Sequence, residues 1–148
     1  MSEGRSGSLT PMDLRALEPL IGEWTTIAHF PGHDPASGRT TFEWLDGGGY
    51  VIQRTYTDDP FPRGIMVFGP DAAGEKVVQH YFDSRGVARV YDVSFEDGVL
   101  ELWRDGPDFA QRYQGRLSPD GATVEGAWER HDGTSWIHDF DLTYTKVR

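Results

Sequence analysis

Closely spaced turn signals divide most of this chain into short segments, and they constrain the fold more than any other feature. From Gly22 onward, nine clusters of Gly, Pro, Asp and Ser separate ten runs that are rich in β-branched and aromatic residues. Most clusters contain Asp-Gly, Pro-Asp or several glycines, whose backbone preferences suit tight hairpins. Connections this short favour pairing between consecutive antiparallel strands, so we predict a β-meander. The clusters are Pro31–Gly38, Asp46–Gly49, Asp58–Gly64, Gly69–Gly74, Asp83–Gly86, Glu96–Gly98, Asp105–Asp108, Ser118–Gly121 and His131–Thr134.

A sheet of about ten consecutive antiparallel strands is wide enough to curl on itself. Closing it pairs the two outer strands and removes the free edges along which sheets aggregate. A sandwich of two sheets uses a similar number of strands and is the alternative. We therefore predict an all-β fold, a single closed antiparallel up-and-down barrel of about ten strands.

One helix signal precedes these strands. Thr10, Pro11 and Asp13 form a capping-box-like start with Asp13 at the third helical position. An apolar stripe at helical spacing follows from Leu14 and ends before Gly22, so we predict one short N-terminal helix. No later segment has a sustained helical period.

Length and composition favour a single domain. The chain has 148 residues, and no linker, repeat or change in composition divides it. Residues 1–9 are small and polar and are predicted to be a flexible tail, and residues 10–148 to be the barrel domain. The absence of cysteine excludes disulfides, thiolate nucleophiles and thiolate metal sites.

The charge balance argues against nucleic-acid and membrane partners. Lys+Arg is 14 against Asp+Glu 24, which gives a formal net charge of −10 and repels phosphate backbones and anionic lipids. The first residues lack the apolar segment of a signal peptide, and no apolar run approaches the roughly 18 residues of a membrane span. We expect a cytoplasmic monomer or small homo-oligomer whose partner is a small molecule.

Period-two alternation in the last run predicts an aromatic face. Trp136, His138, Phe140, Leu142 and Tyr144 share one side unless a bulge intervenes. We predict that this face points into the barrel and carries His138 with it.

Several middle runs mix aromatic and polar residues on one face. Buried without water, such Arg, Glu and Gln side chains would be costly, whereas a partly hydrated cavity would tolerate them. The alternative is that these faces point to solvent. The candidate ligand-binding residues are Arg54, His80, Arg89, Tyr91, Glu101, Trp103, Tyr113 and His138.

Two short motifs resemble the lipocalin-like (calycin) superfamily. Gly22-Glu23-Trp24 is similar to its Gly-x-Trp signature at the start of the first strand, and the run that ends the chain, Thr143-Tyr144-Thr145-Lys146-Val147, adds to the likeness. The resemblance implies a Trp at the closed end of the barrel under a basic side chain, a role for Lys146 or Arg148. The number of runs is nearest the fatty-acid-binding-protein and nitrobindin branch, and the chain also resembles small bacterial lipocalin-like proteins of unassigned function.

The nitrobindin likeness raises haem as an alternative ligand. Nitrobindins bind haem through a histidine of the final strand, which makes His138 the residue to test. Counted from the terminal motif, however, the family position falls on Asp139. A one-residue offset places a side chain on the opposite face, so we predict no cofactor and keep haem as the alternative.

The sequence leaves four functions open. The first, to which we commit, is non-catalytic binding of a small apolar or amphipathic molecule inside the barrel. The second is a haem protein acting on nitrogen oxides through His138. The third is a barrel isomerase, cyclase or hydrolase with His138, His80 or Glu101 as the acid–base group. The fourth is a structural protein with a filled barrel.

A metal site is not predicted. His29 and His33 have a spacing found in metal sites, but Pro31 and Gly32 lie between them and break any regular face. With no cysteine in the chain, the usual remaining ligands are too few.

Overall fold

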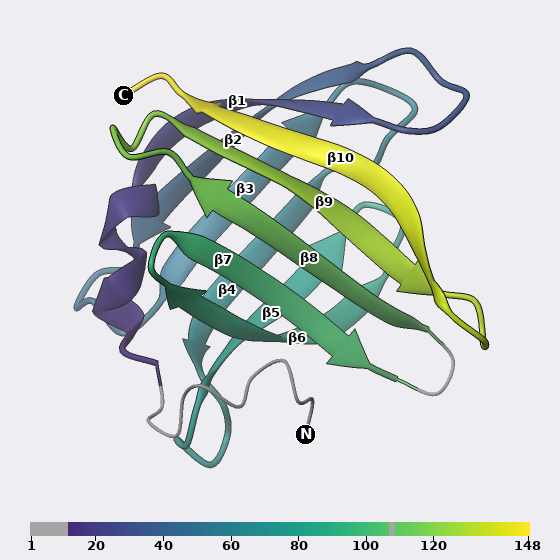
Figure 1. Cartoon of the computed structure of the whole chain (residues 1–148). Coiled ribbons are helices and arrows are strands. Elements are labelled where there is room, and N and C mark those ends of the chain that lie inside the picture. Colours follow the sequence, from purple (N-terminus) through teal and green to yellow (C-terminus); the bar gives the residue numbers. More distant parts are fainter. Residues whose placement is uncertain (1–11, 107–108) are drawn as a thin grey trace.

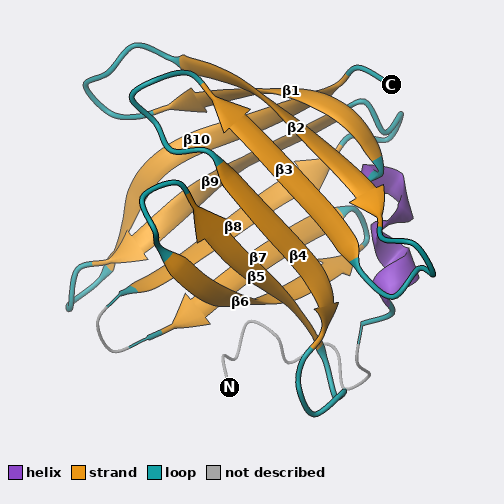
Figure 2. Cartoon of the chain, turned by 180° about the vertical axis from the view of Figure 1, so that it is seen from behind, coloured by secondary structure: helices purple, strands orange, loops and turns teal. Residues whose placement is uncertain are grey.

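The runs rich in β-branched and aromatic residues form the strands of a closed barrel. The computed structural model describes residues 12–106 and 109–148. Each strand pairs antiparallel with the next along the chain, and β1 pairs with β10, which closes the sheet (Figures 1 and 2). The prediction of a ten-stranded up-and-down barrel is therefore confirmed, and the sandwich is excluded. The strands are β1 (Gly22–His29), β2 (Ala36–Trp44), β3 (Val51–Thr57), β4 (Gly64–Pro70), β5 (Val77–Asp83), β6 (Ala88–Glu96), β7 (Val99–Asp105), β8 (Ala110–Leu117), β9 (Thr123–His131) and β10 (Trp136–Lys146).

The strand boundaries differ from the predicted turns at several places. Gly38 lies inside β2, Gly64 begins β4, and Gly69 is the last but one residue of β4. The turn predicted at Asp105–Asp108 lies partly outside the described residues. Glycine marks a turn only when its neighbours do not pair, and in these strands the ladder continues through it.

A single 3₁₀-helix, η2 (Leu14–Leu20), precedes β1 in the described part of the chain. Asp13 is its N-cap, with extended backbone and a carboxylate that accepts a hydrogen bond from the Arg15 N–H at 2.9 Å. The prediction placed Asp13 at the third helical position, and this is wrong because Asp13 itself caps the described helix. Thr10 and Pro11, the predicted start, lie outside the described residues.

The helix η2 lies across one end of the barrel and is held there by three strands (Figures 1 and 2). The Trp24 indole N–H donates to the Leu20 carbonyl at 2.8 Å. The Trp44 indole N–H donates to the Glu18 carboxylate at 3.0 Å. Lys146 Nζ donates to the Pro19 carbonyl at 3.2 Å. We call this the closed end of the barrel.

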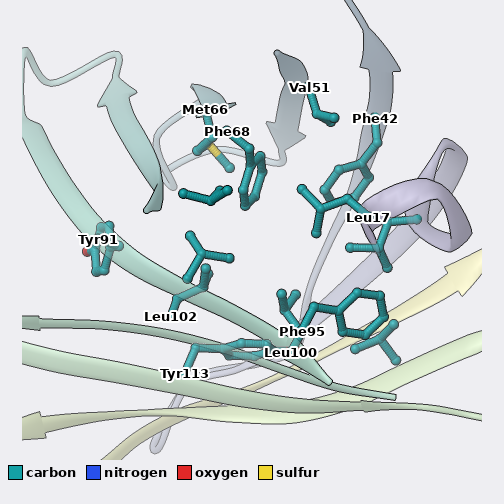
Figure 3. Packing of buried hydrophobic residues seen from close by; sticks show 14 of the residues in the cluster. Leu17, Phe42, Val51, Met66, Phe68, Tyr91, Phe95, Leu100, Leu102 and Tyr113 are labelled. Atoms are coloured by element: carbon teal, nitrogen blue, oxygen red, sulfur yellow. The ribbon is translucent and has the colours of Figure 1, made fainter. Parts of the chain in front are cut away.

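The apolar core is packed against the inner side of η2. Leu17, Trp24 and Val51 are fully buried at this end. Figure 3 shows Leu17 and buried side chains of several strands, among them Phe42 and Val51, directed toward one another. Burial of these side chains contributes the hydrophobic stabilisation of the fold, at roughly 25 cal/mol for each Å² removed from water.

At the start of β1, position 22 has no space for a side chain, which explains the glycine there. The φ of Gly22 is +139°, and a Cβ added there would lie 2.3 Å from the backbone oxygen of Arg148. The Glu23 N–H donates to the same oxygen at 2.8 Å, so the two segments lie in direct backbone contact. A side chain at Gly22 would push them apart.

Within the described residues, no helix has the length and apolar character needed to cross a bilayer.

Candidate ligand-binding site

A cavity of about 530 Å³ extends from the apolar core toward the end of the barrel opposite η2. Because β1 starts beside η2 and the strands alternate in direction, the connections after β1, β3, β5, β7 and β9 all lie at that opposite end. Phe30, Phe61 and Arg85 line the cavity from these connections, so we call this end the mouth. The volume falls in the range of small-molecule sites, roughly 300–1,000 Å³.

Stacked aromatic rings form one wall of the cavity from the mouth inward. The Phe30 ring stacks on Phe61 with centroids 4.6 Å apart and planes inclined by 6°. It also stacks on Phe140 at 4.4 Å and 28°. Phe140 continues to Trp128 at 6.4 Å and 26°, and Trp128 meets Tyr91 edge-on at 5.6 Å. Such pairs add stability beyond the area they bury, and here the same side chains form an aromatic part of the cavity lining.

Buried amides supply the polar part of the lining. Gln53, Gln79 and Gln111 come from β3, β5 and β8, and each is less than a tenth exposed. Gln53 Nε2 donates to Thr40 Oγ1 at 3.1 Å. For the Gln79 amide, the structure shows no hydrogen bond within residues 12–106 and 109–148. A buried amide without a partner costs free energy, so these groups favour a ligand or water beside them.

The Gln53 amide also contacts Tyr144, whose ring borders the cavity. Burial raises the pKa of Tyr144 to about 12, although the hydrogen bond with Gln53 acts in the opposite direction. Tyr144 therefore keeps its proton throughout the physiological range and acts as a neutral hydroxyl.

Arg89, Tyr91 and Gln111 form a hydrogen-bonded series on the opposite part of the lining. The Tyr91 hydroxyl donates to Gln111 Oε1 at 2.6 Å. Burial raises the pKa of Tyr91, and a hydrogen bond from the Arg89 guanidinium partly offsets that effect. The Arg89 guanidinium carbon also lies 4.7 Å from the centre of the Phe109 ring. The charge is thus held at the mouth by an aromatic face and a phenol.

A second polar group sits at the edge of the cavity. The Tyr81 hydroxyl donates to Asp83 Oδ2 at 2.6 Å, and Arg85 pairs with the same oxygen at 2.6 Å. Burial alone would raise the pKa of Asp83, but hydrogen bonds from Arg85 and Tyr81 outweigh it and hold that pKa well below its usual range. Burial, with the hydrogen bond to Asp83, raises the pKa of Tyr81. Asp83 is therefore a carboxylate and Tyr81 a neutral phenol at neutral pH.

Of the eight residues predicted from the sequence, two line the cavity. They are Arg89 and Tyr91, from β6. Tyr113 lies on the same buried face of β8 as Gln111 and belongs to the apolar core, where it packs against Trp128 with ring centroids 5.3 Å apart. Its hydroxyl fits over two glycines, because a Cβ at Gly115 or Gly126 would come within 2.4 or 2.6 Å of it.

Four predicted residues lie outside the cavity because their strands have the opposite phase. In β3, Gln53 points inward, and Arg54 pairs with Glu43 on the outside. In β5, Gln79 points inward and His80 is exposed. In β7, Leu100 and Leu102 point inward. The predicted residues Glu101 and Trp103 alternate with them and do not line the cavity.

His138 is also outside the cavity, and a β-bulge is the reason. The pairing of β10 with β9 shifts between His138 and Phe140. The extra residue turns His138 outward, where its ring lies 2.9 Å from the Asp141 carboxylate, and Asp139 and Phe140 both line the cavity. The prediction that His138 points inward with the aromatic face is therefore wrong.

The sequence reasoning missed several residues of the lining. Gln79 follows two buried valines, Val77 and Val78, so no alternation marks its face. Trp128 could have been found, since period-two alternation in β9 places it on the same face as Val124 and Gly126. For Asp139, alternation gave the wrong face because a bulge cannot be located from one sequence, although the count from the terminal motif had placed the nitrobindin position there.

Neither a haem ligand nor a metal cluster is supported by these positions. All five histidines of the chain are described, and none lines the cavity. The residue at the position of the nitrobindin ligand, Asp139, does line it, but it supplies a carboxylate instead of an imidazole. The residues present do not fit haem held by a histidine. In the described part of the chain, no group of three or more His, Cys, Asp or Glu side chains is arranged to hold a metal ion.

The closed end shows the geometry expected from the calycin resemblance. Lys146 Nζ lies 5.2 Å from the centre of the Trp24 ring, and Arg148 pairs instead with Glu23 at 3.1 Å. The structure is thus compatible with a lipocalin-like fold. A scan against protein-family models and a search of curated proteins gave no match to this chain.

Proposed function

We propose that the protein is a non-catalytic binding barrel of the lipocalin-like type, which encloses a small apolar or amphipathic molecule. One observation carries the proposal: the cavity of about 530 Å³ combines stacked aromatic rings with buried amides. A barrel that served only as a scaffold would gain stability from filling this space with apolar side chains. Trp24 beneath Lys146 supports the lipocalin-like assignment.

The alternatives from the sequence lose the residues on which they depended. A haem protein required His138 inside the barrel, and an isomerase or cyclase required an acid–base group among His138, His80 and Glu101. None of the three lines the cavity. Binding is therefore the function that the geometry supports best.

The first test is native mass spectrometry of gently purified protein beside its denatured mass. We expect a reproducible excess mass that disappears on denaturation and identifies the bound molecule by its value. The second test titrates the neutral dye N-phenyl-1-naphthylamine, whose fluorescence increases in apolar surroundings. We expect saturable binding with one site for each chain, accompanied by quenching of Trp128.

A pair of variants on β1 separates the cavity from the outer surface. Ala28 lines the cavity, whereas its neighbour Ile27 is 43% exposed on the outside. Ala28→Trp should abolish dye binding because the new ring occupies the cavity, and Ile27→Trp should leave it unchanged. No excess mass together with no saturable binding to the wild-type protein would overturn the proposed function.

A further inference from the structure

Within the described part of the chain, one guanidinium of the cavity has no carboxylate partner. The carboxylate of the lining, Asp139, lies 3.9 Å from Arg130. Two arginines line the cavity, and Arg85 is paired with Asp83. For Arg89, no carboxylate lies within ion-pair distance among the residues that the structure describes. A half-buried guanidinium in an apolar surrounding is stabilised most by an anion, because both charges are then less exposed to competing water.

The direction of the hydrogen bonds beside Arg89 also favours an acceptor. Tyr91 gives its proton to Gln111 Oε1 at 2.6 Å, and the positive charge of Arg89 acts to lower the pKa of Tyr91. The only proton of Tyr91 and the oxygen of Gln111 are thus already used. The remaining groups of this series are N–H donors, on the Arg89 guanidinium and on Gln111 Nε2. A ligand placed here is recognised through its acceptors.

The apolar wall indicates the shape of the same ligand. Phe61, Phe30, Phe140 and Trp128 form consecutive pairs whose planes are inclined by 6°, 28° and 26°. All four side chains line the cavity, so an aromatic ring system bound there gains edge-to-face or offset contacts with their rings. An alkyl chain gains only the burial of its surface there. The volume of about 530 Å³ accommodates a ring system of drug-like size.

We propose that the ligand is a planar aromatic anion, with its carboxylate, sulfonate or comparable group bound by Arg89 and the Gln111 amide and its rings against the aromatic wall. This inference rests on the proposed function and specifies its ligand class. The net charge of −10 repels anions from the protein as a whole, so the attraction comes from this local site.

Two dyes with the same ring framework test the proposal. Anilinonaphthalene-8-sulfonate carries a sulfonate, and N-phenyl-1-naphthylamine lacks it. We expect the wild-type protein to bind the sulfonate dye more tightly than the neutral dye. Arg89→Gln should lower the affinity for the sulfonate dye by about tenfold or more relative to the affinity for the neutral dye, since a charge-assisted hydrogen bond is lost.

Matched variants separate the local charge from the net charge and from damage to the fold. Arg116→Gln removes a charge of the same kind from the exposed face of β8 and should leave the affinity for both dyes unchanged. Arg89→Lys should restore part of the sulfonate affinity because the charge is kept and the planar fork is lost. The neutral dye reports whether each variant still has an intact cavity.

Each outcome decides one question. The anion site would be overturned if the wild-type protein bound the two dyes equally, or if Arg89→Gln lowered the affinity for both dyes equally. Either result would leave the binding barrel in place. Equal losses in Arg89→Gln and Arg116→Gln would assign the effect to net charge and overturn the proposal as well. If neither dye binds the wild-type protein, the proposed function and the anion site both fail.

Discussion

The closed end and the mouth of the barrel are built from the same strands but filled differently. At the closed end, Leu17, Trp24 and Val51 are fully buried in an apolar core. Toward the mouth, the inward positions hold amides, phenols and two guanidiniums around an open space. Side chains that would be expensive in a dry core are retained where a cavity allows water or a ligand beside them. We therefore assign stability to the closed end and recognition to the mouth.

The strongest test of this division compares two tryptophans. Trp24→Ala removes a fully buried ring and its hydrogen bond to Leu20, and we expect a loss of about 3–5 kcal/mol in the free energy of unfolding. Trp128→Ala enlarges a cavity that already exists and should cost less than about 3 kcal/mol while reducing dye binding. Urea unfolding and dye titration measure the two quantities. Equal destabilisation by the two substitutions would contradict the division.

The next largest effect concerns the backbone contact beside η2. Gly22→Ala combines a positive φ with a Cβ 2.3 Å from the Arg148 oxygen, and we expect a loss of about 1–3 kcal/mol. Gly47 has a φ of +93° in an open hairpin with no atom within 4 Å of the added Cβ. Gly47→Ala measures the backbone strain alone, so thermal unfolding of both variants isolates the steric contact. A loss for Gly22→Ala no larger than the control would show that the strands separate there at no cost.

Two glutamines of the cavity should respond differently to the same substitution. Gln53→Leu loses the hydrogen bond to Thr40 and should cost about 1 kcal/mol. Gln79→Leu removes a buried amide without a hydrogen bond in the described part of the chain, so stability should stay the same or rise by up to about 1 kcal/mol. Chemical unfolding at one pH tests both. A clear loss for Gln79→Leu would mean that this amide has a structural partner.

The last prediction concerns Asp83, whose contribution to stability is lost in acid. Its pKa is lowered in the folded protein, so the carboxylate contributes stability that is fully present above its unfolded pKa, about 4, and is lost as the pH falls toward the lower folded value. Asp83→Asn should flatten this acid limb of the stability curve. Unfolding measured between about pH 2 and 6 gives the slope. An unchanged slope in the variant would exclude Asp83 as its source.

The turns made the fold predictable, whereas the cavity depended on the phase of each strand. Hairpin residues are local signals, so the number of strands and their sequential pairing could be inferred. Closure followed from the cost of free edges. In β1, Trp24, Thr26 and Ala28 are buried on one face, as period-two alternation requires.

The prediction of which face points inward failed where both faces of a strand carry large or polar residues. In β7, Glu101 and Trp103 alternate with Leu100 and Leu102, and a cavity wall accepts either set. In β10 the alternation was clear but a bulge reversed it at His138. Register depends on which neighbours pair across strands, and a single sequence does not contain that information directly.

The seam between β1 and β10 has a consequence for how the chain folds. Every other pair of neighbouring strands is consecutive, but this seam joins Trp24 to Lys146, residues far apart in the chain. Loop-closure entropy makes such a long-range pairing slow, so we expect the seam to form last. Until then β1 and β10 are both open edges, and the half-exposed Ile27 lies on one of them. The same contact that completes the barrel thus sets the interval during which the newly folded sheet is most prone to pair with another chain.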